Sequence, residues 1–175
     1  MVKLSMGLVL TLALCGGAVL AAAKPAAKPK EPPKPVELSG TVSRVVDGDT
    51  FWLKTAADTD PTVIRIDGID APERCQAGGA ESTAALNELA LNRTVTVRVS
   101  ATDDHGRTVG KVLDGSVDIG DRLVRDGRAW SLRYKYDRGP YMAEERMALA
   151  LKRGLHAEGG AIQPRDFRQR NGPCK

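Results

Sequence analysis

The fold is decided by residues 63–73, which read VIRIDGIDAPE. In the first half of this stretch, apolar Ile64 and Ile66 alternate with charged Arg65 and Asp67. A repeat of two residues is typical of a strand with one buried face, and the glycine that follows ends it. We therefore expect a half-buried strand here, with the flanking segments assembled around it.

Charged groups are crowded around the end of this strand. Within nine residues the chain carries one cation, Arg65, and three carboxylates, on Asp67, Asp70 and Glu73. Such crowding is costly unless a metal ion or an anionic substrate belongs there, which favours a site that cleaves phosphodiesters. A plain surface ion pair between Arg65 and Asp67 is the alternative.

The N-terminal segment has the composition of a secretory signal. Lys3 gives a positive start, residues 8–14 form an apolar run, and three alanines at 21–23 provide a small-residue cleavage site. We therefore predict a signal peptide over residues 1–23 and a periplasmic or secreted location. Lipid attachment at Cys15 is the alternative, although no small residue directly precedes it. No later segment is apolar enough to span a membrane.

The remainder of the chain divides into three parts by composition. Residues 24–37 contain five prolines among alanines and lysines, which predicts an extended linker. Residues 38–158 suit one folded domain, and residues 159–175 are expected to be an irregular, solvated basic tail. Without the signal segment, 25 basic and 22 acidic residues leave a net charge of +3. That excess fits a polyanionic ligand and fits ordinary solubility equally well.

Two cysteines, Cys75 and Cys174, follow the signal segment. In an oxidising compartment a disulfide between them is favoured over two free thiols. It would hold the C-terminal segment beside the loop around residues 71–73. An intermolecular bridge or two reduced thiols are the alternatives.

Alternation and turn signals predict five strands and three helices. The strands are expected within residues 38–55 on both sides of the turn at 47–49, then at 63–66, 94–100 and 107–113. The helices are expected at 81–91, 118–127 and 140–153, the last with Lys152 and Arg153 in its final turn and Gly154 just past its end. This order predicts an α+β fold, mainly β, built as a five-stranded OB-type barrel with three helices.

Four short blocks of the sequence resemble the thermonuclease, or staphylococcal nuclease-like, family. They are VDGDT at 46–50, Arg65 followed by DAPE at 70–73, DHGR at 104–107, and LVRDG at 123–127, in the family's order. The resemblance implies an OB barrel with three helices. It also implies calcium-dependent hydrolysis of DNA and RNA that leaves 3′-phosphate ends.

The resemblance implies a role for each matching residue. Asp49 and Asp70 would bind calcium with the backbone carbonyl of Ala71, Glu73 would be the general base, and Arg65 and Arg107 would bind the phosphate. Oxygen ligands suit a hard cation, and guanidinium groups match phosphate oxygens. His105 stands where the family has a tyrosine, and Tyr134 and Tyr136 are candidates for substrate contacts. A packing or surface role is the alternative for these three residues.

The sequence therefore predicts an exported, monomeric, calcium-dependent nuclease acting on DNA, RNA or both. The alternative is a catalytically inactive OB-fold module that binds nucleic acid. Such modules are expected to lack one or more of the acids and arginines, and none is missing here. A third possibility is a partner-binding domain whose acids hold only a structural calcium ion.

Overall fold

The computed structural model describes residues 36–57, 59–134, 136–172 and 174. The predicted signal peptide, Cys15 and all but the last two residues of the predicted linker lie outside these ranges. Strand β1 (Glu37–Val45) begins one residue before the expected start of the domain. Among the helices of the described ranges, none combines the length and apolarity needed to cross a bilayer.

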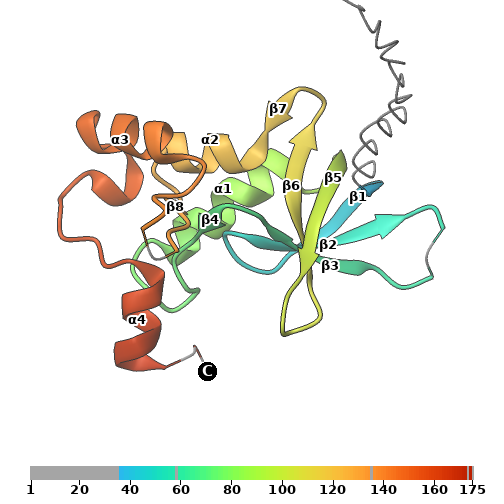
Figure 1. The fold of residues 1–175 in the computed structure, drawn as a ribbon, viewed down its shortest axis with the longest axis horizontal. Helices are drawn as coiled ribbons and strands as arrows, with labels where there is room; N and C mark the ends of the chain where they lie inside the picture. Colours follow the sequence, from blue (N-terminus) through green and yellow to red (C-terminus); the bar gives the residue numbers. More distant parts are fainter. Residues whose placement is uncertain (1–35, 58, 135, 173, 175) are drawn as a thin grey trace, which may run out of the picture. The chain divides into compact units, whose positions relative to one another are not determined.

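Five strands form a closed barrel, as predicted (Figure 1). The strands are β1, β2 (Thr50–Thr55), β3 (Thr62–Ile66), β5 (Thr94–Thr102) and β6 (Thr108–Asp114). β1 pairs antiparallel with both β2 and β5, and β6 pairs antiparallel with β5. A parallel pairing of β3 with β6 places Ile64 opposite Thr108 and closes the barrel. The α+β, mainly β, OB-type architecture is therefore confirmed.

Short strands and helices complete the domain. β4 (Ile69–Asp70) pairs with β8 (Trp130–Ser131), and β7 (Val117–Asp118) pairs with β6. The helices are α1 (Gly79–Ala90), α2 (Ile119–Arg125), α3 (Met142–Ala150) and α4 (Pro164–Asn171), with a 3₁₀ turn, η1 (Gly154–His156), after α3. The first three helices lie where three helices were predicted, with bounds that differ by a few residues.

The barrel and helices bury one apolar core. Ile64 and Ile66 of β3 are fully buried, as their alternation with charged residues predicted. Leu86 of α1 and Leu123 of α2 are also fully buried in the core. Other large side chains with at most 1 % exposure are Val42, Phe51, Leu53, Ile69, Val95, Val97, Val112 and Ile119. The strand that leads to the acidic stretch is therefore fixed by packing on its apolar face.

The turn between β1 and β2 is packed against α1. A Cβ atom on Gly48 would lie 2.0 Å from Oγ of Ser82 and 2.8 Å from Cβ of Ala71. Gly48 does not have a positive φ, so the Asp-Gly signal found the turn for a different physical reason. The glycine is required for close approach, and that approach fixes the position of Asp49.

Helix α2 begins as predicted, whereas α3 ends earlier than predicted. Asp118 accepts hydrogen bonds from the N–H groups of Gly120 and Asp121, which confirms it as the N-cap of α2. Helix α3 ends at Ala150, so Lys152 and Arg153 lie beyond it and not in its last turn. The chain leaves the helix here because Lys152 adopts a left-handed conformation with φ of +51°.

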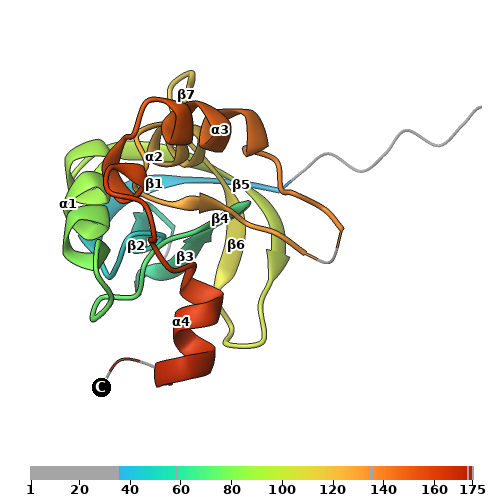
Figure 2. The ribbon, with the colours of Figure 1, turned by 90° about the vertical axis from the view of Figure 1, so that its left-hand side faces the viewer.

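The prediction of an irregular C-terminal tail is wrong. Residues 164–171 form α4, with Pro164 and Asp166 in its first turn and Arg168 and Arg170 in its last. Each residue type stands where backbone geometry and the helix dipole favour it. Figures 1 and 2 show that α4 lies apart from α3. This helix brings residues from the end of the chain to the site described below.

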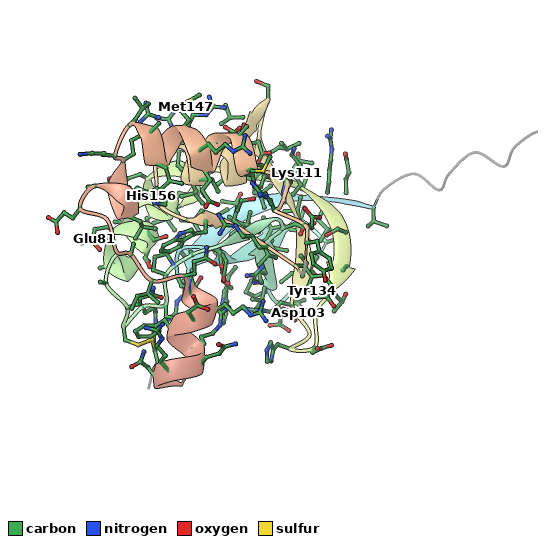
Figure 3. The ribbon with its side chains drawn as sticks, turned by 60° about the vertical axis from the view of Figure 1, so that its left-hand side comes forward. Glu81, Asp103, Lys111, Tyr134, Met147 and His156 are labelled. Atoms are coloured by element: carbon green, nitrogen blue, oxygen red, sulfur yellow. A yellow bond between two sulfur atoms is a disulfide. The ribbon has the colours of Figure 1, made fainter. Side chains whose placement is uncertain are left out.

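His156, labelled in Figure 3, is buried in the 3₁₀ turn after α3, and its ring lies against that of Trp130. The two ring centroids are 6.1 Å apart in an edge-to-face arrangement. Its Nε2 atom is buried and has no hydrogen-bond partner in the described ranges. Burial lowers the pKa of His156, and the charge of Glu145 opposes that effect. Protonation of this imidazole therefore disfavours the folded state.

We expect mild acid to destabilise the domain through His156. Below pH of about 6.5 the unfolded chain binds a proton that the folded chain rejects, so the free energy of unfolding falls as pH drops. The slope is at most about 1.4 kcal/mol per pH unit and vanishes below the folded pKa. His156→Leu should flatten the decline of melting temperature between pH 7 and 5. His105→Asn, which changes an exposed histidine, is the control, and equal declines in both variants would contradict the assignment.

Candidate active site

A pocket of about 490 Å³ lies where the β1–β2 turn, β3, the segment after β4, the β5–β6 turn and α4 meet. Its lining residues are Asp47, Asp49, Arg65, Asp70, Ala71, Pro72, Glu73, His105, Arg107 and Arg168. All six residues predicted to be catalytic or metal-binding are in this set. The barrel therefore brings these six residues together, although Asp49 and Arg107 are 58 positions apart in the sequence.

Asp49 is fixed by hydrogen bonds on both carboxylate oxygens. Its Oδ1 accepts from Oγ1 of Thr50 at 2.9 Å, and its Oδ2 accepts from the N–H of Ala71 at 3.2 Å. Its own N–H donates to Oδ1 of Asp47 at 3.0 Å. Asp49 is 7 % exposed. The turn therefore presents a buried, oriented carboxylate to the pocket.

Arg65 joins the two buried carboxylates. Its Nη2 lies 3.3 Å from Oδ2 of Asp49 and 3.5 Å from Oδ1 of Asp70, and it donates to the carbonyl of Ile69 at 3.2 Å. Among the described residues, Arg65 pairs with Asp49 and Asp70 and not with Asp67, which accepts a hydrogen bond from Oγ of Ser100 at 2.8 Å. Arg65 therefore belongs to the pocket and not to a surface ion pair.

Asp70 and Glu73 share a second arginine that was not predicted. Nη1 of Arg168 donates to Oδ1 of Asp70 at 3.2 Å and to Oε1 of Glu73 at 2.7 Å, and Nη2 donates to Oδ2 of Asp70 at 3.2 Å. Burial raises the pKa of Asp70, and the hydrogen bonds and charge of Arg168 oppose that shift. The expectation that the C-terminal basic residues are only solvated is therefore wrong for Arg168.

Arg107 and His105 reach the pocket from the β5–β6 turn. Nε of Arg107 donates to Oδ2 of Asp103 at 2.7 Å, while the N–H groups of Arg107 and His105 both donate to Oδ1 of Asp103. Asp103 is labelled at this turn in Figure 3. The pairing holds the Arg107 guanidinium at the pocket. A substrate contact by His105 stays a prediction.

The two tyrosines that were candidates for substrate contacts lie outside this pocket. Tyr134 lines a different pocket with Lys111 and Tyr141, and it is 69 % exposed. Tyr136 is fully exposed. Their side chains offer surface for a bound strand, and their role in binding stays a prediction.

Asp47, Asp49 and Asp70 repel one another in the pocket, because the charge of Asp49 raises the pKa of both of the other acids. Burial, together with the charge of Asp49, raises the pKa of Asp47 to about 6. Asp47 is thus a further acid of the pocket beside Asp49 and Asp70. A cation is the ligand that this part of the pocket would stabilise.

The donor set fits a hard divalent cation. Asp49 and Asp70 offer carboxylate oxygens, and the peptide of Ala71 is held beside Asp49 through its N–H. Within the described ranges, no group of three or more acidic, histidine or cysteine side chains could enclose a metal ion. A cation here would therefore complete its coordination with water or substrate oxygens, which both calcium and magnesium accept.

The predicted disulfide between Cys75 and Cys174 is present, with their Cα atoms 5.8 Å apart. It links the loop that follows Glu73 to the segment that follows α4. A signal for α4 was available in the sequence, because Pro164 and Asp166 precede Arg168 and Arg170 at helical capping positions. No sequence signal indicated which acids Arg168 would contact.

The protein is a small OB-type barrel in which acids and arginines line one pocket. The family model described as staphylococcal nuclease homologue matches residues 63–158 of this chain. The chain belongs to this family, which confirms the resemblance seen in the four sequence blocks.

Several relatives support the assignment. An uncharacterized endonuclease of Escherichia coli is 35 % identical over 138 residues, covering 77 % of this chain and 87 % of that protein. Protein ParB of Escherichia coli is 32 % identical over 145 residues, covering 76 % and 80 %. A probable staphylococcal-like nuclease of rice, CAN2, is 40 % identical over 111 residues, covering 62 % of this chain and 30 % of that protein. The chain therefore matches under a third of the rice relative's length.

Proposed function

We propose that this protein is an exported nuclease that uses calcium to hydrolyse phosphodiester bonds of DNA, RNA or both, leaving 3′-phosphate ends. The observation that carries the proposal is the meeting of Asp49, Asp70 and Glu73 with Arg65 and Arg107 in one pocket. Membership of the family and the endonuclease names of bacterial relatives support it. Calcium and the type of product rest on the family resemblance, and export rests on the composition of residues 1–23.

The chain's own residues divide the chemistry among them. Glu73 takes a proton from water as the water oxygen bonds to phosphorus, which contributes about 10² to 10⁴ in rate. The bond from phosphorus to O5′ breaks, and O5′ leaves with the bonding electrons and is protonated by solvent water, while Glu73 returns its proton to the solvent. Arg65 and Arg107 bind the phosphate oxygens, whose negative charge increases in the transition state.

Asp49, Asp70 and the carbonyl of Ala71 would hold the calcium ion. When bound, that ion supplies positive charge beside the phosphate and offsets the charge of the buried carboxylates. Arg65 and Arg107 would still bind the phosphate beside the ion, because each planar guanidinium can donate to two phosphate oxygens at once.

The purified protein is expected to shorten single-stranded DNA in calcium and to leave it intact in a chelator. Terminal transferase should extend the products only after a phosphatase has removed their 3′-phosphates. An intact strand under all metal conditions would contradict the proposal. Magnesium and manganese in parallel reactions would identify the metal, and an RNA strand would identify the substrate preference.

Calcium is also expected to raise the melting temperature, by roughly 10 °C at a hundredfold excess over its dissociation constant. The shift should be lost in Asp49→Asn, because an amide is a weaker ligand than a carboxylate. Addition of a nucleotide bisphosphate should raise the melting temperature further if the pocket binds substrate. A shift with calcium but no further shift with the bisphosphate would favour the alternative that the acids hold only a structural calcium ion.

A further inference from the structure

The C-terminal helix delivers a third arginine to the pocket. A single guanidinium, that of Arg168, bridges Asp70 and Glu73 with three hydrogen bonds of 2.7–3.2 Å. The side chain of Arg168 is 41 % exposed, against 8 % for Asp70 and 26 % for Glu73. Arg168 therefore caps the two acids from the solvent side.

The orientation of the Glu73 carboxylate depends on this arginine. The backbone of Glu73 is held by its own N–H, which donates to Oε1 of Gln76 at 3.2 Å. In the described part of the chain, the hydrogen bond from Arg168 is the one found for the carboxylate itself. Glu73 lies in a loop, and a long side chain in a loop loses conformational entropy when it is held in one position. Arg168 supplies the contact that selects that position.

Both ends of α4 are attached to the loop that carries Glu73. Before the helix, the carbonyl of Ile162 accepts a hydrogen bond from Nε2 of Gln76 at 2.6 Å. After the helix, Cys174 forms the disulfide with Cys75. The helix and the Glu73 loop therefore form one unit, and Arg168 projects from that unit onto the acids.

We propose that Arg168 is a positioning residue for Glu73 and Asp70, and that the disulfide-linked helix α4 is an integral part of the active site. This inference rests on the proposed nuclease function. The bridge needs the planar fork of arginine, since a lysine amine has no fork to span both oxygens of Asp70 and one of Glu73. A carboxylate oxygen accepts more than one interaction, so Asp70 keeps lone pairs for another ligand.

The test compares Arg168→Gln and Arg168→Lys with Arg170→Gln, which removes the same charge from an exposed position of the same helix. In calcium and single-stranded DNA, kcat of both Arg168 variants should fall by about 10- to 100-fold, because small misplacements of a catalytic group have effects of this size. KM should stay within about twofold, because Arg168 acts through Glu73 and Asp70 and not on the substrate. Arg170→Gln should match the wild type in both constants.

The disulfide gives a second arm to the test. Cys75→Ser/Cys174→Ser should lower kcat in the same direction, with circular dichroism confirming that the barrel remains folded. Combined with Arg168→Gln, it should add little further loss, because both changes remove the same contact and coupled changes are not additive.

The outcomes separate this inference from the proposed function. If the wild-type protein is active and Arg168→Gln has the same kcat, the role of Arg168 is wrong and the proposed function stands. A rise in KM at unchanged kcat would also overturn it, since Arg168 would then be a substrate-binding residue. Full additivity of the cysteine and arginine changes would overturn the role of the disulfide. An inactive wild-type protein would overturn the proposed function and this inference together.

Discussion

Glu73→Gln is expected to lower turnover by about 10² to 10⁴ while leaving DNA binding within a few-fold of the wild type. Glutamine has nearly the same shape and can still accept the hydrogen bond from Arg168. Its amide cannot take a proton from water, so the loss should fall on kcat. Turnover is measured on labelled single-stranded DNA in calcium, and binding by anisotropy of the same strand in a chelator.

Glu81→Gln is the matched control for this prediction. Glu81, labelled in Figure 3, is an exposed acid in the first turn of α1. It does not line the pocket that contains Glu73. Its removal should leave turnover unchanged. Normal turnover in Glu73→Gln would contradict the general-base role. A wild-type protein that binds DNA without cleaving it would instead favour the alternative of an inactive binding module.

Arg65→Gln is expected to affect both stability and turnover. Without Arg65, the carboxylates of Asp49 and Asp70 remain buried and lose a shared cation. Breaking a buried ion pair costs about 3 kcal/mol, which we expect as a loss in the free energy of unfolding without calcium. Turnover should fall by about 10³, the upper end for loss of one donor to a developing charge.

Calcium should raise the melting temperature of Arg65→Gln more than that of the wild type, because the ion replaces part of the missing positive charge. Arg65→Lys should recover part of the stability and little of the turnover, since lysine lacks the planar fork. Arg98→Gln is the control: Arg98 forms an exposed strand ion pair with Glu37, and its loss should cost no more than about 1 kcal/mol. Equal melting temperatures for the Arg65 and Arg98 variants without calcium would contradict the structural part of this prediction.

Much of the barrel was predictable because its signals are local. Alternation along β3 and β5 and the turn at residues 103–106 each depend on neighbours within a few positions. The same is true of Asp118 as the cap of α2. Burial acts on every second residue of a strand and every third or fourth of a helix, so it leaves a pattern in the chain itself.

The errors arose where long-range packing decides the outcome. The turn at Gly48 is present as predicted, but the closeness of Ser82 on α1, which excludes a side chain there, has no signal in the local sequence. Helix α3 was predicted to extend over Lys152, but the chain turns at that residue. The alternatives for Arg65 could not be separated by sequence because Asp67 is near in the chain and Asp49 only in space.

Periodicity in the sequence predicted the class of barrel, and four short blocks that resemble a known family predicted the family and the six residues that meet in the pocket. Both signals are local: burial repeats along each strand and helix, and each block spans only a few neighbouring residues. Tertiary structure alone decided that Arg168 lies against Asp70 and Glu73, 98 and 95 positions earlier. An ion pair leaves no periodic trace, and its partners are set by which surfaces the folded backbone brings together. The cysteines pointed to that region, and only the folded helix shows which side chain enters the pocket.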